Sequence, residues 1–126
     1  MAYFDSHCHL DPMRYGDDLP QVIARARSAG VTGMTVIGTR AADSEAAAEL
    51  AAREPGLAAA AGIHPNDVAE IAADEWDRVV RLVESGRSAA VGETGLDCIA
   101  TRRPAICNAS SSTAISGWPR NTLFPS

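Results

Sequence analysis

The chain contains three histidines, and two of them lie close together near its start. His7 and His9 are one residue apart and follow the apolar pair Tyr3-Phe4, which favours a short β-strand. Side chains alternate faces along a strand, so both imidazoles project from one face, about 7 Å apart. Imidazole nitrogens are common ligands of divalent cations. The spacing therefore indicates a metal site, although two surface histidines that alternate by chance would give the same pattern.

The elements that must position these side chains form a regular alternation. Apolar segments predict strands near residues 3–9, 31–37, 57–63 and 88–92. Cap residues and glycine stops predict helices from about Leu19 to Gly30, from Asp43 or Ser44 to Arg53, and from about Asp74 to Gly86. Strands that alternate with helices imply a parallel sheet with right-handed crossovers, and hence an α/β fold.

The remaining candidate residues also follow strand ends. His64 comes after the third predicted strand and Glu93 after the fourth. Residues 38–40, after the second strand, predict an ordinary turn. Because chemistry gathers at the carboxyl ends of strands in parallel α/β folds, we expect His64 and Glu93 to lie near His7 and His9. Scattered polar residues do not readily explain why every histidine falls at this one pole.

Composition limits the class of protein. The chain has 126 residues, with 46% hydrophobic and 21% charged residues, which is typical of one globular domain. No apolar run approaches the roughly 20 residues of a membrane span, and the first residues lack the pattern of a signal peptide. Three cysteines without a CxxC pair favour a reducing, cytoplasmic location. With a net charge of −5, phosphate binding would require a local site or a metal.

Three motifs resemble the N-terminal signatures of the TatD-type metal-dependent deoxyribonucleases. They are Asp5-Ser6-His7-Cys8-His9-Leu10-Asp11, Gly62-Ile63-His64-Pro65 and Gly92-Glu93-Thr94-Gly95-Leu96-Asp97. The resemblance covers residues 1–97 and implies a TIM-type (β/α)8 barrel. A complete barrel typically needs about 250 residues, so we expect an incomplete one of about four β/α units.

The resemblance also implies an activity and a set of site residues. It makes His7, His9 and Glu93 metal ligands and His64 a substrate-binding residue, with no catalytic group beyond the metal-activated water. The implied reaction is hydrolysis of phosphodiester bonds in DNA. Mg²⁺ is the first candidate cation, and a histidine-rich site equally suits Zn²⁺ or Mn²⁺.

The resemblance stops at Asp97, and the composition changes there. The further ligands implied by the family are two histidines and an aspartate on later strands, but residues 98–126 contain no His, Asp or Glu. We expect residues 98–126 to form an irregular tail. Codons that encode Cys98 to Thr101 contain, one base out of frame, codons for Tyr-Arg-Asp. One lost base after Asp97 would therefore explain the change, so an out-of-frame translation is one hypothesis. A short protein with a divergent C-terminus is the other.

These motifs leave three hypotheses about function. The chain is a metal-dependent deoxyribonuclease, a catalytically inactive truncated fragment of one, or a related hydrolase that acts on another ester or an amide. An open parallel sheet leaves an unpaired edge, and self-association through that edge is a further hypothesis.

Overall fold

The computed structural model describes residues 1–95, and the segment expected to be an irregular tail lies outside them, as do the last two residues of the third motif. In chain order the elements are β1 (Tyr3–Cys8), α1 (Pro12–Tyr15), the 3-10 helix η1 (Gly16–Asp18), α2 (Leu19–Ser28), β2 (Val31–Ile37), α3 (Ala41–Arg53), β3 (Leu57–Ala61), α4 (Glu75–Glu84) and β4 (Ala90–Val91).

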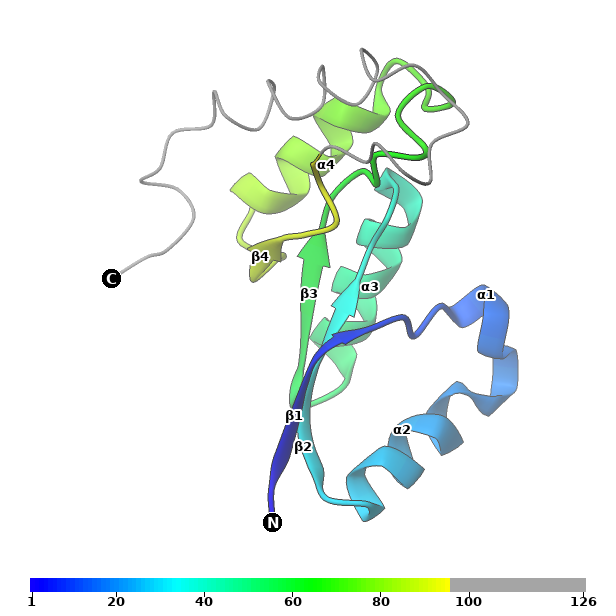
Figure 1. The fold of residues 1–126 in the computed structure, drawn as a ribbon, viewed down its shortest axis with the longest axis vertical. Coiled ribbons are helices and arrows are strands. Elements are labelled where there is room, and N and C mark those ends of the chain that lie inside the picture. The colour runs from blue at the N-terminus through cyan, green and yellow to red at the C-terminus, as the bar shows by residue number, and fades with distance from the viewer. Residues whose placement is uncertain (96–126) are drawn as a thin grey trace.

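The strands form one sheet in the order β1-β2-β3-β4, and every neighbouring pair is parallel. The sheet curls as it passes from β1 to β4, and the helices lie along its outer side (Figure 1). One continuous hydrophobic cluster joins α2, α3 and α4 to side chains from the same face of the strands. The fold is therefore a four-stranded, parallel half-barrel, and the expectation of an incomplete TIM-type barrel is confirmed.

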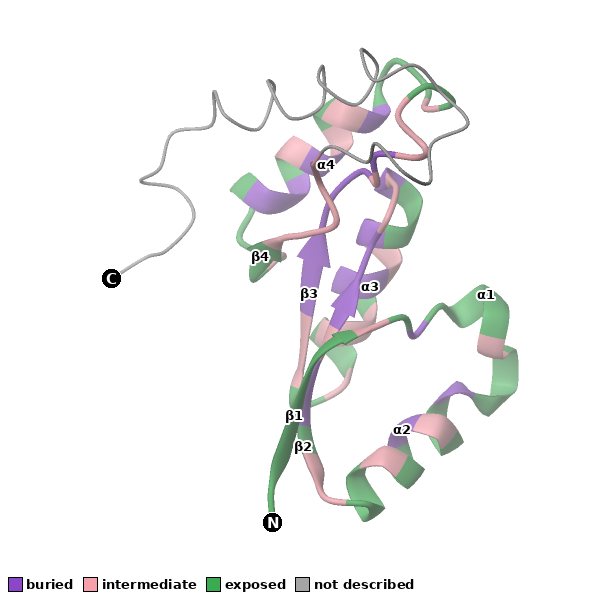
Figure 2. Cartoon of the chain, viewed as in Figure 1, coloured by how far each residue is buried: buried purple, intermediate pink, exposed green. Residues whose placement is uncertain are grey.

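The core lies between the helices and the middle strands. Buried segments follow β2, β3 and the inner face of α3, whereas β1 is exposed along nearly its whole length (Figure 2). α3 contacts the sheet through small residues, because Ala47 and Ala48 are almost fully buried. Over residues 1–95, no helix has the length and apolar character needed to span a bilayer.

The start of α3 differs from the sequence prediction. The helix begins at Ala41, two residues before Asp43, and neither Asp43 nor Ser44 caps it. Instead, the carboxylate of Glu75, from the first turn of α4, accepts a hydrogen bond from the Ala41 N–H at 3.3 Å. A partner distant in the chain thus satisfies an N–H group that a local side chain usually satisfies.

Candidate metal centre

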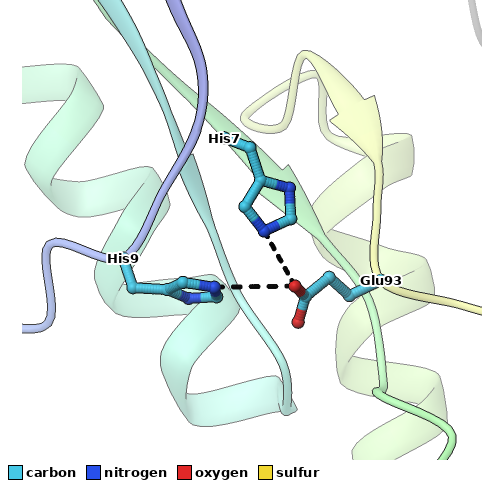
Figure 3. A group of neighbouring side chains, drawn as sticks. All are labelled: His7, His9 and Glu93. Carbon is cyan, nitrogen blue, oxygen red and sulfur yellow. Dashed lines mark ion pairs between the residues drawn. The ribbon is translucent and has the colours of Figure 1, made fainter.

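Three side chains meet at the carboxyl end of the sheet. Oε1 of Glu93 lies 2.9 Å from Nε2 of His7 and 3.5 Å from Nε2 of His9. Both imidazoles point toward the carboxylate, which reaches them from the segment after β4 (Figure 3). The two rings are nearly perpendicular, with centroids 5.2 Å apart. The structure therefore brings Glu93 to His7 and His9, from which it is far removed in the sequence.

The spacing of the donor atoms fits a bound cation. One ligand atom from each residue lies within 4.8 Å of the others. Donors on a tetrahedral zinc ion, with bonds of about 2.0–2.2 Å, are roughly 3.4 Å apart, which is close to the 2.9 and 3.5 Å measured here. The histidine side chains are about half exposed, at 53% and 44%. Both imidazoles are thus accessible to solvent.

His7 lies in β1 and His9 follows it, and the register of β1 is irregular around His7. The pairing with β2 shifts between Asp5 and Cys8, and the Asp5 carboxylate accepts a hydrogen bond from the His7 N–H at 3.1 Å. Cys8 turns the other way and donates to the Thr35 carbonyl at 3.3 Å. Burial, with a smaller contribution from the charge of Asp5, raises the pKa of the Cys8 thiol to about 11. With its Sγ directed to Thr35, Cys8 lies outside the group of ligand atoms formed by His7, His9 and Glu93.

Glu93 has an unusual backbone. Its φ of 47° lies in the left-handed region, and it is the non-glycine residue with positive φ among residues 1–95. A side chain makes this conformation unfavourable, so the surrounding structure must hold it. Such outliers concentrate at functional sites, where the position of a side chain matters more than local backbone energy.

His64 lies at the same pole but outside this group of ligand atoms, among the residues that the structure describes. Its backbone N–H donates to the Thr39 carbonyl at 2.8 Å, which ties the segment after β3 to the segment after β2. Its Nδ1 accepts a hydrogen bond from the Asn66 N–H at 3.1 Å. Because Nδ1 acts as the acceptor, neutral His64 carries its proton on Nε2. It therefore offers an N–H donor rather than a lone pair for a cation.

Sequence reasoning missed an ion pair beside these segments. Nη2 of Arg40 lies 2.6 Å from Oε1 of Glu75 and also donates to the Glu70 carbonyl at 3.2 Å. The guanidinium of Arg40 lowers the pKa of the Glu75 carboxyl to about 2, more than burial raises it. The sequence predicted an ordinary turn at residues 38–40, and the structure has a bend there, to which this ion pair adds a long-range contact. No spacing rule could have found this pair, because its partners are 35 positions apart.

The fold is a parallel half-barrel in which His7, His9 and Glu93 meet at the carboxyl ends of the strands, and comparisons with known proteins show the family to which such a chain belongs. The family model described as TatD related DNase matches residues 4–109. The chain therefore belongs to the TatD related DNase family.

Individual relatives match the same part of the chain. It is 41% identical over 95 residues to a protein of Pantoea sp. (strain At-9b), and 39% identical over 95 residues to one of Erwinia billingiae (strain Eb661), both named 3'-5' ssDNA/RNA exonuclease TatD. Each alignment covers 75% of this chain and 36% of the relative. The chain thus spans about a third of the length of the curated relatives it matches.

Solved structures show the same architecture. The crystal structure of YJJV, a TatD homolog from Escherichia coli K12, superposes with a TM-score of 0.77 at 27% identity, covering 86% of this chain and 43% of that one. A TatD family hydrolase from Entamoeba histolytica gives a TM-score of 0.76 at 20% identity, covering 92% and 45%, and supports the fold alone.

Proposed function

We propose that His7, His9 and Glu93 hold a divalent cation in an enzyme that hydrolyses phosphodiester bonds in DNA. The observation that carries this proposal is the convergence of two Nε2 atoms on Oε1 of Glu93. When bound, such a cation activates water for attack on phosphorus and neutralises charge on the phosphate. The relatives named as ssDNA/RNA exonucleases support a nucleic-acid substrate.

The donor set bears on which cation is held. Two imidazole nitrogens suit Zn²⁺ or Mn²⁺, whereas the carboxylate and the phosphate oxygens of a substrate suit Mg²⁺. Mg²⁺ is our first candidate because the substrate itself supplies oxygen ligands. The histidines make Mn²⁺ the most useful experimental probe, since it accepts both nitrogen and oxygen.

His64 has a different role in this proposal. Its Nδ1 is occupied by the Asn66 N–H, so Nε2–H is the group it offers to an incoming ligand. An N–H donor suits a phosphate oxygen, and the bond between the His64 N–H and the Thr39 carbonyl fixes the backbone that carries it. We therefore assign His64 to binding the substrate phosphate.

Two further parts of the proposal concern the cellular location of the protein and the exposed edge of its sheet. We place the protein in the cytoplasm, because its three cysteines form no paired-cysteine motif. We also propose that β1 pairs with another strand, because it is at the sheet edge and exposes Tyr3 and Phe4 by 54% and 63%. Light scattering tests whether a second copy supplies that strand.

A nuclease assay tests the activity. The chain, freed of metal and then supplied with Mg²⁺ or Mn²⁺, should shorten single-stranded DNA, and the His7→Ala/His9→Ala variant should not. Arg53→Ala provides a control, because Arg53 is exposed at the opposite end of α3. Cleavage that survives the double substitution, or a wild-type chain that cleaves nothing with either cation, contradicts the proposal. If the chain hydrolyses another ester or an amide but not DNA, the proposed substrate class is wrong.

A further inference from the structure

The segments that follow β3 and β4 touch through two glycines. If Gly62 carried a side chain, its Cβ would overlap the carbonyl oxygen of Gly92 and lie only 3.0 Å from the carbonyl carbon. The same atom would also lie 3.1 Å from Cγ2 of Thr94. Backbone atoms cannot rotate away as a flexible side chain can, so any residue larger than glycine at position 62 displaces Gly92.

Gly62 is itself held in place by a buried hydroxyl. Ser44, on α3, is fully buried, and its Oγ accepts a hydrogen bond from the Gly62 N–H at 3.2 Å. The same hydroxyl donates to the Gly62 carbonyl at 3.4 Å. Gly38 makes room for this arrangement, because a Cβ there would overlap Ser44. The ends of β2 and β3 and the first turns of α3 are thus fixed relative to one another.

Glu93 comes directly after Gly92, so the position of Gly92 determines where the backbone of Glu93 lies. Its left-handed backbone, with φ of 47°, is a conformation that surrounding contacts must maintain. The contact between Gly62 and Gly92 lies one residue away, and the Gly92 N–H donates to the Ala61 carbonyl at 3.1 Å. A displacement of Gly92 therefore also displaces the carboxylate of Glu93.

We propose that Gly62 and Ser44 are positioning residues for Glu93. They set the height of Gly92 above the end of β3, and this height places Oε1 of Glu93 at 2.9 Å from His7. Ligand distances in metal sites are defined to about 0.2 Å, so even a small displacement matters. The part of this inference that concerns metal affinity rests on the proposed function, whereas the part that concerns the position of Glu93 does not.

Metal affinity is the first readout. Calorimetric titration with Mn²⁺ should show a Kd about 10- to 100-fold weaker for Gly62→Ala, the usual effect of disturbing the groups that orient a ligand. Ser44→Ala removes one orienting hydrogen bond and should weaken binding about fivefold. Gly86→Ala is the control, because Gly86 also resists substitution, with φ of 72°, but a Cβ there meets nothing within 4 Å. Its Kd should equal that of the wild type.

A second substitution separates positioning from general destabilisation. In the Glu93→Gln background the ligand that Gly62 positions is already impaired, so adding Gly62→Ala should cost no further affinity. Equal fold losses in the two backgrounds would mean that Gly62 acts by another route, which overturns the inference.

The position of Glu93 can be measured without any metal. In the metal-free wild type, nuclear Overhauser effects should connect the His7 imidazole with the Glu93 side-chain methylenes, and Gly62→Ala should remove them while Gly86→Ala keeps them. If Gly62→Ala does not fold, weaker effects in Ser44→Ala serve as the same test. Effects absent from the wild type, or unchanged in both site variants, overturn the inference. A wild type that shows these effects, loses them in Gly62→Ala and binds no Mn²⁺ supports the inference while contradicting the proposed function.

Discussion

Arg40 and Glu75 form an ion pair that joins two segments at the carboxyl end of the sheet. Nη2 of Arg40 lies 2.6 Å from Oε1 of Glu75, whose side chain is only 9% exposed. The same carboxylate accepts hydrogen bonds from the N–H groups of Ala41 and Ala72, at 3.3 and 3.1 Å. It therefore accepts hydrogen bonds both from the first turn of α3 and from the segment before α4.

Removing this carboxylate should destabilise the fold. Glu75→Ala leaves a guanidinium and two N–H groups without their partner, and we expect the free energy of unfolding to fall by about 3 kcal/mol. Glu45→Ala is the matched control, because the Glu45–Arg78 pair is more exposed, at 38% and 32%, and should cost below about 1 kcal/mol. Urea unfolding followed by circular dichroism measures both. Equal losses would contradict the assigned role of Glu75.

The same carboxylate predicts a dependence on acid. Arg40 lowers the folded-state pKa of Glu75 from its ordinary 4.5 to about 2. A lowered pKa stabilises the folded state fully above about pH 4.5, and this contribution is lost as the pH falls toward 2. The stability difference between the wild type and Glu75→Gln should therefore be constant from pH 7 to 5 and shrink from pH 4.5 downward. A difference independent of pH would show that the charge of Glu75 contributes nothing.

His64 gives a prediction about substrate binding. Gln places an amide N–H near the position of Nε2, whereas Asn does not reach it, so His64→Gln should preserve the substrate KM within about fivefold while His64→Asn raises it about tenfold or more. Neither variant should change the Kd for Mn²⁺, because Nε2 of His64 carries a proton. Steady-state kinetics and calorimetry distinguish the two effects. A large loss of metal affinity in either variant would make His64 a ligand after all.

The buried face of α4 gives a prediction about packing. Leu82 is 5% exposed, whereas Val80 is partly exposed. Leu82→Ala should therefore lower the free energy of unfolding by about 2–5 kcal/mol, and Val80→Ala by much less. Thermal or urea unfolding tests the difference, and similar losses would mean that α4 is rotated from the orientation described.

The sequence predicted the architecture well because hydrophobic periodicity carries that information. The bounds of β2 agree with the prediction, and the alternation of strands and helices indicated the parallel sheet. Details that depend on distant partners were less accessible. α4 buries Val79, Leu82 and Val83, as hydrophobic periodicity leads one to expect, but it also buries the charged Glu75, which periodicity does not predict. Glu75 is buried because Arg40, from another segment, neutralises it, and no local pattern contains that information.

Some features of the candidate site could likewise be predicted from the sequence, and others could not. Side-chain alternation and strand ends were enough to select His7, His9 and Glu93, whose atoms the structure brings together. The left-handed backbone of Glu93 and the Gly62–Gly92 contact could not be predicted, because they arise where β3 and β4 meet in space. The metal-binding role of the three side chains stays a prediction until a cation is measured there.

Titration of the metal-free chain with Mn²⁺ in a calorimeter tests the central claim most directly. The account predicts saturable binding to the wild type, with affinity at least tenfold weaker in His7→Ala/His9→Ala and in Glu93→Gln. Glu49→Ala, which removes an exposed carboxylate on α3, should bind as the wild type does. Binding that is undiminished by the loss of His7 and His9, or a wild-type chain that binds no Mn²⁺, would contradict the account.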